Sequence, residues 1–308
     1  MSKTKKIISI LLAMTMFVAT LVLLCSCYPF IEVHIDGIYA VLDTSTRTAN
    51  VYGFDKDGSV GAFEPQVCII PDTIFYDDHI YTVTELSSGW NNDSEFVVGG
   101  HVKQLVIPQT VKSIDLLSFA ITDTFDYLEE IQVSAYNEYY ASLGGVLYSK
   151  DYSTLIMYPP AKRDSTMYIH KEVTQIFEDQ RNYSNIYVEK VNVEVGNTVF
   201  SAVDGILLSN YGTRLEYVPY AHGGIIELPD GVTTISKWSL RYANVEHLYL
   251  PMSICNVEYV DDIQYNPLRY VANLYFEEAE PQYIVVWDKY LMEVHSGVTR
   301  ENFREIAK

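Results

Sequence analysis

The most constraining feature of the sequence is a short alternating pattern that returns seven times. In each copy two apolar residues flank one other residue, so both apolar side chains point to the same side of an extended chain. The seven pairs are Leu105/Ile107, Ile131/Val133, Met167/Ile169, Val191/Val193, Ile226/Leu228, Leu248/Leu250 and Leu274/Phe276. The second members of successive pairs lie 26, 36, 24, 35, 22 and 26 positions apart. One such unit cannot bury its apolar residues alone, so we expect neighbouring units to stack, each adding one strand to a parallel sheet.

A duplicated segment accounts for the two long intervals. Gly145–Pro159 recurs sixty positions later as Gly205–Pro219, with five identities at that offset. Each copy lies in one of the long intervals, and without roughly a dozen residues each interval would match the others. The duplication therefore predicts a β-hairpin inserted twice into a repeat of about 22–26 residues, which is within the leucine-rich-repeat range. Gly145 and Gly205 are expected to open tight bends.

A second signature follows several of the strands. Val111–Ile114, Val173–Ile176 and Val232–Ile235 all read Val-x-x-Ile and begin three or four residues after a strand. They are expected to supply two further buried aliphatic residues to each coil. Ser118-Phe119-Ala120 follows the first of them and predicts a short turn or helix on the far side.

In this combination the chain resembles the BspA-like leucine-rich-repeat surface proteins of bacteria. Their repeat runs from a leucine strand ending in Ile-Pro, through Val-x-x-Ile, to Ala-Phe; here Ile107-Pro108, Val111–Ile114 and Phe119 follow that order. The family also carries a Gly-Val-Leu-Tyr-Ser…Leu-Ile-x-Tyr-Pro unit, as at Gly145–Pro159. The resemblance spans about residues 68–278 and departs from the family pattern where His170 replaces the strand-ending proline. It implies a repeat solenoid and a role in adhesion or ligand binding at the cell surface.

The predicted fold is a β-rich leucine-rich-repeat solenoid of the α/β class, with few short helices, inserted β-hairpins and an N-terminal β-hairpin cap. Val, Ile and 26 Tyr residues favour strands. The expected parts are a lipoprotein signal peptide (1–26), a tether (27–36), an N-terminal β cap region (37–100), the solenoid (101–280) and a C-terminal cap (281–308).

Both caps have local signals. At the N-terminal end we expect strands at Gly37–Leu42 and Thr48–Phe54, and a second hairpin turning at Tyr76–His79. Asp55–Gly58 begins like a calcium loop, but its glycine comes too early and no bidentate glutamate follows in place, so a hairpin turn is expected. At the other end, a segment at 283–294 and a short helix at 300–307 are expected to close the repeat.

The N-terminus predicts export. Three lysines precede the apolar run Ile7–Leu24, as in a signal peptide. Leu24-Cys25-Ser26-Cys27 then resembles a bacterial lipobox, with Cys27 as the acylated residue; Cys25 fits less well because the bulky Leu24 precedes it. An uncleaved transmembrane anchor is the alternative, since the run is at the lower edge of spanning length. We expect the protein to be exported, lipid-anchored to the bacterial cell envelope and surface-exposed.

Charge and cysteine usage narrow the partners. Beyond the leader, 18 basic and 40 acidic residues leave a net charge of −22, which argues against nucleic acid as a partner and against lying flat on anionic lipid.

Two cysteines remain beyond the leader, Cys68 and Cys255, each in an apolar stretch. Two buried, unpaired thiols are expected; a disulfide between them is the alternative.

No catalytic or metal motif emerges from the sequence. The nucleophile-elbow, zinc-protease, dinucleotide and phosphate-loop patterns are missing, and the seven histidines show no zinc-ligand spacing. The acidic pairs Asp77-Asp78, Asp261-Asp262 and Glu277-Glu278 are interpreted as turns or solvated faces, with weak calcium binding as the alternative. We therefore expect no catalytic residue, no cofactor and no metal site.

Candidate binding residues lie between the paired inward positions, on the opposite face of each strand. In chain order they are Val106, Gln132, Tyr168, Asn192, Glu227, Tyr249 and Tyr275. Stacking would align them in one column, and such an extended face is the usual binding surface of a solenoid. Tyrosine is favoured at recognition surfaces, although it is also simply a good strand residue that packs against its neighbours.

Three functions remain open at this stage. The first is a non-enzymatic surface lipoprotein that binds a protein or another ligand in adhesion, with Tyr168, Asn192, Glu227, Tyr249 and Tyr275 as candidate contacts. The second is a carbohydrate-binding or glycan-handling accessory lipoprotein. The third is a structural component of the envelope without a soluble ligand.

Overall fold

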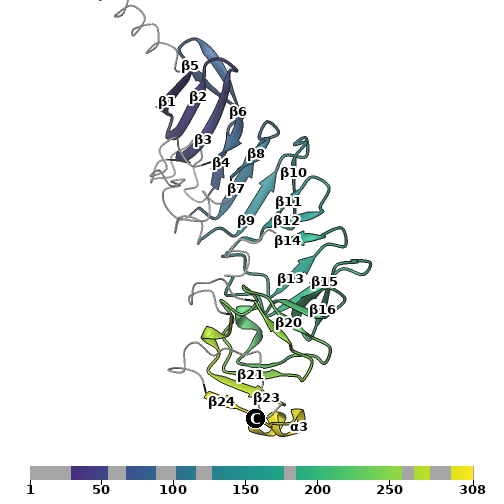
Figure 1. Ribbon diagram of the computed structural model, residues 1–308. Coiled ribbons are helices and arrows are strands. Elements are labelled where there is room, and N and C mark those ends of the chain that lie inside the picture. The colour runs from purple at the N-terminus through teal and green to yellow at the C-terminus, as the bar shows by residue number, and fades with distance from the viewer. Residues whose placement is uncertain are drawn as a thin grey trace, which may run out of the picture.

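The seven predicted repeat strands are all present in the computed structural model, and they pair in parallel (Figure 1). The structure describes residues 29–54, 67–87, 102–115, 127–176, 185–258, 267–277 and 293–307. The predicted strands are β7 (Gln104–Ile107), β9 (Glu130–Val133), β13 (Thr166–Ile169), β15 (Lys190–Val193), β19 (Ile225–Glu227), β21 (His247–Leu250) and β23 (Asn273–Phe276). Two further strands extend this set at its ends, β4 (Val67–Ile69) and β24 (Glu293–His295).

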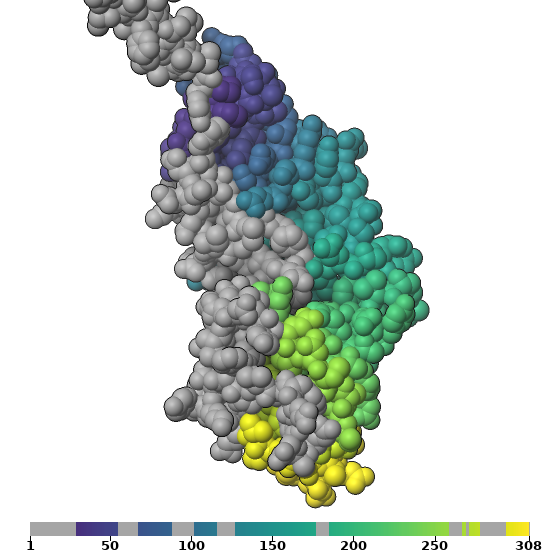
Figure 2. All heavy atoms as spheres, viewed as in Figure 1, coloured from purple at the N-terminus to yellow at the C-terminus, as the bar shows by residue number. Residues whose placement is uncertain are grey.

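These strands form three parallel ladders, in the orders β4-β7-β9, β13-β15 and β19-β21-β23-β24. Pairing is in register, so that Leu105 lies opposite Ile131 and Leu248 opposite Leu274. The inward members of each pair are buried, except Val133 and Val193, which are half-buried. The order of the chain follows the long axis of the molecule, from the purple end to the yellow end in Figure 2.

The Val-x-x-Ile segments build a second set of parallel ladders. Their two-residue strands are β8 (Ser113–Ile114), β14 (Gln175–Ile176) and β20 (Thr234–Ile235), and β22 (Asn256–Val257), from the segment Ile254–Val257, pairs with β20. The valines at 111, 173 and 232 are fully buried, as predicted. Of the three isoleucines, Ile235 is buried, as predicted, whereas Ile114 and Ile176 are only half-buried.

Each copy of the duplicated segment is part of a three-stranded antiparallel meander, and the prediction of a simple hairpin is wrong in this respect. The strands are β10 (Tyr140–Leu143), β11 (Val146–Ser149) and β12 (Thr154–Met157) in the first meander, and β16 (Phe200–Val203), β17 (Ile206–Ser209) and β18 (Arg214–Tyr217) in the second. The first strand of each meander precedes the duplicated segment, which begins at Gly145 or Gly205. The duplication alone therefore indicates only two strands.

The glycines open tight bends, as predicted. Gly144-Gly145 and Asp204-Gly205 are two-residue hairpin turns in which both residues have positive φ, +57° and +79° in the first and +49° and +81° in the second. Turns of this kind match the twist of the flanking strands. A Cβ at Gly145 would lie 2.9 Å from Glu130 Cγ, and one at Gly205 would lie 2.8 Å from Lys190 Cβ. Glycine is therefore required both for its backbone conformation and for its small size.

The meanders explain why the main ladder is divided into three. The Ile131 N–H donates to the Gly145 carbonyl at 2.9 Å, and the Val191 N–H donates to the Gly205 carbonyl at 2.8 Å. The turn of each meander thus takes a hydrogen bond from the strand that precedes it, β9 or β15, where the next ladder strand would otherwise pair. The last strand of each meander then pairs in parallel with β14 or β20.

A buried asparagine ties the turn after β9 to the loop of the preceding coil. Asn137 Nδ2 donates to the carbonyls of Pro108 and Val111 at 2.8 and 2.9 Å. Its Oδ1 accepts from the backbone N–H groups of Tyr139 and Tyr140, both at 2.8 Å. All four hydrogen-bonding positions of this amide are therefore used, with no exposure to solvent.

The same arrangement recurs at Asn185 and Asn197, each of which also makes two side-chain donations and accepts two backbone N–H groups. Asn137 and Asn197 are separated by the sixty-residue offset of the duplication. The offset of the duplication therefore pairs these two asparagines in the sequence, although the alternation of apolar residues in the strands does not point to them.

The N-terminal sheet contains one strand more than expected. Its order is β1-β2-β3-β6-β5, and it comprises β1 (Phe30–Ile35), β2 (Ile38–Asp43), β3 (Thr48–Phe54), β5 (Thr73–Tyr76) and β6 (His79–Leu86). Strands were predicted at β2, β3, β5 and β6, and the turn at 77–78 is confirmed. Residues 30–35 were expected to belong to a tether; instead they pair along their whole length with β2, because Asp36-Gly37 forms a two-residue turn. Strand β6 also pairs with β8, joining this sheet to the repeat.

Both remaining cysteines are free, but only one is buried. Cys68 lies in the core and burial raises the pKa of its thiol to about 12, so it is inert at neutral pH. Cys255 is exposed. The prediction of burial is wrong for Cys255, because the preceding residue, Ile254, takes the buried position at 1% exposure.

Several predictions fall outside the described residues. These are the leader with Cys27, the turn at 55–58, the segment around Phe119 and most of 283–294. The predicted final helix is confirmed as α3 (Arg300–Ile306). The described part of the chain contains no helix with the length and apolarity needed to cross a membrane.

Candidate functional site

The predicted column of residues lies on the outward face of the ladders, in three sections. Tyr168 lies opposite Asn192 across β13 and β15. Glu227, Tyr249 and Tyr275 are successive partners across β19, β21 and β23. The alternation of the strands therefore predicted the correct face, but the exposure of these residues differs sharply along it.

The C-terminal tyrosines do not face solvent, which corrects their assignment as binding residues. Tyr249 is 0% exposed and Tyr275 is 2% exposed. Phe303 of α3 packs against both rings, at centroid distances of 5.2 and 5.0 Å, and His295 stacks on Tyr275 at 4.6 Å. The outward face is covered here by the chain's own C-terminal helix, so these tyrosines belong to a small core.

Glu227 is also occupied within the chain. Its carboxylate accepts from Arg300 and, at 2.6 and 2.7 Å, from Arg304. The hydrogen bond from Arg304 and then that from Arg300 lower the pKa of Glu227 against the opposing effect of burial. Arg300 further donates to the Leu228 carbonyl at 3.0 Å and lies 4.9 Å from the Tyr249 ring centroid. Glu227 therefore anchors α3 rather than an external ligand.

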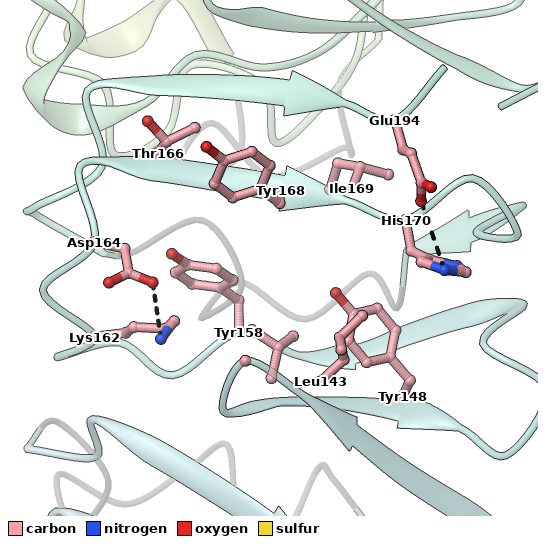
Figure 3. Close-up of a pocket in the computed structure, with 12 residues that line it drawn as sticks. Leu143, Tyr148, Tyr158, Lys162, Asp164, Thr166, Tyr168, Ile169, His170 and Glu194 are labelled. Carbon is pink, nitrogen blue, oxygen red and sulfur yellow. Dashed lines mark ion pairs between the residues drawn. The ribbon is translucent and has the colours of Figure 1, made fainter. Parts of the chain in front are cut away.

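The β13–β15 section of the face remains open. Tyr168 is 66% exposed, and Asn192 is exposed beside it. Tyr168 lies at the edge of a hollow of about 330 Å³ between β13 and the turn of the first meander (Figure 3). A volume of this size is at the lower end of the range for small-ligand pockets.

Tyrosines and aliphatic groups form the walls of this hollow. Tyr168 and Ile169 come from β13, Tyr148 and Val146 from β11, and Tyr158 follows β12. Burial raises the pKa of Tyr148 to about 12, and burial is also the first cause of the raised pKa of Tyr158. Both phenols therefore stay protonated at neutral pH.

Two ion pairs lie at opposite ends of the hollow (Figure 3). Lys162 Nζ is 2.9 Å from Asp164 Oδ2 at one end, and His170 Nε2 is 3.5 Å from Glu194 Oε2 at the other. Glu194 Oε2 also accepts the Lys171 backbone N–H at 3.0 Å. Each end of the hollow thus offers one acidic and one basic group.

Sequence reasoning found Tyr168 and Asn192 but missed the residues that meet them across the hollow. A comparison of the two copies of the duplication points to these residues, because the copies differ there. Gly144, Tyr148 and Tyr158 of the first copy correspond to Asp204, Leu208 and Val218 in the second. The aromatic lining is therefore specific to the first copy. Among the described residues, no three His, Cys, Asp or Glu side chains gather in a way that would hold a metal ion.

Comparison with known proteins gives matches only among solved structures. No protein-family model matches the chain, and neither does any curated protein. The pneumococcal vaccine antigen PcpA is 12% identical with a TM-score of 0.43, over 87% of this chain and 85% of its own. A leucine-rich cell surface protein from Faecalibacterium prausnitzii is 11% identical with a TM-score of 0.35, over 89% and 97%.

A leucine-rich repeat protein from Eubacterium ventriosum is 13% identical with a TM-score of 0.35, over 87% of this chain and 95% of its own. The structural neighbours are bacterial leucine-rich-repeat proteins. Identities and TM-scores this low do not carry a ligand or an activity over to this chain.

Proposed function

We propose that this protein is a non-enzymatic, exported surface lipoprotein that binds an extracellular ligand in adhesion. In this proposal the successive ladders belong to one leucine-rich-repeat solenoid, with the β1–β3 sheet as its N-terminal cap. The face of the solenoid is divided between two roles. Its C-terminal section holds α3, and its central section, around Tyr168 and Asn192, is the ligand site.

The observation that carries this proposal is the exposure of Tyr168 beside the hollow. Tyr168 is two-thirds exposed and borders the hollow, and an accessible aromatic ring at the edge of a concave surface is typical of recognition sites. The contrast with Tyr249 and Tyr275 on the same face supports a distinct role, because the chain supplies a cover for those two rings. Asn192 adds an adaptable amide next to Tyr168.

The test is a binding screen of the full-length protein, purified in mild detergent, against immobilised extracellular-matrix proteins and glycans. We expect saturable binding that falls at least about tenfold in Tyr168→Ala, the loss of one central aromatic contact. Tyr211→Ala is the matched control, since Tyr211 is 95% exposed between β17 and β18 of the second meander and does not line the hollow. Binding that is indifferent to Tyr168, or no binding to any surface, would overturn the proposal.

The anchor is a separate part of the proposal, and it rests on the lipobox sequence. Metabolic labelling with a palmitate analogue in a bacterial host is expected to mark the protein and to disappear in Cys27→Ala. Cys25→Ala is the matched control and should keep the label. Labelling that persists in Cys27→Ala would contradict acylation at this residue.

A further inference from the structure

We propose that the hollow beside Tyr168 binds the ring of an uncharged saccharide, as a monosaccharide or the terminal unit of a short glycan. This inference rests on the proposed function and names the ligand class of the same site.

The charges at the hollow favour a neutral ligand. The acids Asp164 and Glu194 would repel an anionic group at either end, and the Lys162 ammonium would disfavour a cationic one at its end. A hydroxyl group meets neither penalty, because it can donate to a carboxylate and accept from an ammonium or imidazole at the same time. Asp164 is well exposed, with 57% of its side chain accessible, and its carboxylate can accept further hydrogen bonds.

The walls favour a ring with apolar faces. Tyr168 on β13 offers an accessible ring at the edge of the hollow, and the almost fully buried Tyr148 and Tyr158 line its meander side (Figure 3). Val146 and Ile169 complete the apolar lining. The C–H face of a sugar ring can pack against a phenol ring while its hydroxyl groups reach the ion pairs at the two ends. A purely aliphatic peptide side chain would use the walls and leave both ion pairs without new partners. The combination of aromatic walls and polar ends therefore favours a saccharide over a peptide.

The lining of the hollow leaves open space at Gly144. This glycine lines the hollow, and a Cβ built on it meets no atom within 4 Å. The second meander has Asp204 at the corresponding position and lacks tyrosine at 208 and 218. The first copy thus combines an aromatic lining with open space at Gly144.

The experiment is an array of neutral oligosaccharides, sialylated and uronic-acid glycans, and synthetic peptides, probed with the full-length protein in mild detergent. We expect binding to one or more neutral glycans and none to acidic ones. Affinity for the bound glycan should fall at least about tenfold in Tyr168→Ala and in Asp164→Asn, each of which removes one class of contact. Tyr211→Ala should bind as the unaltered protein does, and the melting temperature of every variant shows whether it is folded.

The outcomes separate the two proposals. Tyr168-dependent binding to peptides or matrix proteins without any glycan binding would overturn the saccharide inference and keep the proposed function. Selective binding of acidic glycans would overturn it as well. Glycan binding that survives Tyr168→Ala in a folded variant would place the sugar elsewhere and contradict this site. If no immobilised ligand shows Tyr168-dependent binding, both proposals fail.

Discussion

Replacing Asn137 by alanine tests how much the buried asparagine contributes to the repeat. The substitution removes four hydrogen bonds of 2.8–2.9 Å at a site with no solvent exposure. It leaves two backbone carbonyls, of Pro108 and Val111, and two N–H groups, of Tyr139 and Tyr140, without this partner. These four groups belong to two neighbouring coils, so their loss loosens the contact between coils.

The expected magnitude follows from the cost of unsatisfied buried groups, about 1–3 kcal/mol each. The four costs do not add fully, because a water molecule can enter the space left by the amide and satisfy some of the groups. We expect the free energy of unfolding to fall by about 3 kcal/mol, which is large for a single substitution. For a chain of this size, that fall lowers the melting temperature by roughly 5 °C.

The assay is urea and thermal denaturation followed by circular dichroism. Asn197→Ala is expected to cost less than Asn137→Ala, because Asn197 makes the same set of bonds at a half-exposed site. Glu138→Ala, at an exposed neighbour, should leave the stability unchanged. A loss below about 0.5 kcal/mol for Asn137→Ala, the range of ordinary surface substitutions, would refute the reasoning.

Three further predictions concern the meander turn and the C-terminal helix. Gly205→Ala forces a Cβ to within 2.8 Å of Lys190 Cβ at a φ of +81°, so thermal denaturation should show a loss of about 1–3 kcal/mol; unaltered stability would contradict the turn geometry. Phe303→Ala removes the ring that covers the two C-terminal tyrosines and should release α3, with a loss of about 3–5 kcal/mol for that contact. Hydrogen exchange of the α3 amides measures it, and unchanged protection would refute the packing. Because the folded-state pKa of Glu227 is lowered, its carboxylate stabilises the docked α3 above the ordinary pKa of 4.5, and this stabilisation is lost as pH falls through the folded pKa. After correction for intrinsic rates, the α3 amides should therefore exchange faster in acid than at neutral pH. Glu227→Gln should remove this pH dependence, and its persistence in that variant would contradict the role of Glu227.

The strands were predictable because their cause is local. An apolar pair separated by one residue can be buried only if the chain is extended, and this rule located β7, β9 and the five later strands. The tight turns were predictable for a similar reason, since only glycine suits the conformation at positions 145 and 205. The repeat of the text at a constant offset then indicated that the two insertions are equivalent.

The remaining features depend on partners that are distant in the chain. Strand β10 has weak alternation, and its pairing is set by the turn that follows it rather than by its own residues. The alternation of side chains along a strand identified the face on which Tyr249 and Tyr275 lie. It held no information on the residue that covers this face, Phe303 of the C-terminal helix. The hollow likewise needs side chains from β11, β12 and β13 together, so Tyr168 alone indicated a candidate contact without indicating a cavity.

The central claim is that the hollow beside Tyr168 is the ligand site, and Gly144→Asn tests it most directly. Asparagine is tolerated at the φ of +57°, and the resulting Asn-Gly pair is a preferred two-residue hairpin turn, so the melting temperature should stay the same or rise. Gly144 lines the hollow and no atom lies within 4 Å of a Cβ built on it, so the new side chain adds bulk to the lining without a clash. The measurement is the affinity of this variant for the neutral glycan that the unaltered protein binds, with Asp204→Asn in the second meander as the matched control. We predict a loss of about tenfold or more in Gly144→Asn and no change in Asp204→Asn; undiminished affinity in a folded Gly144→Asn protein would contradict the claim.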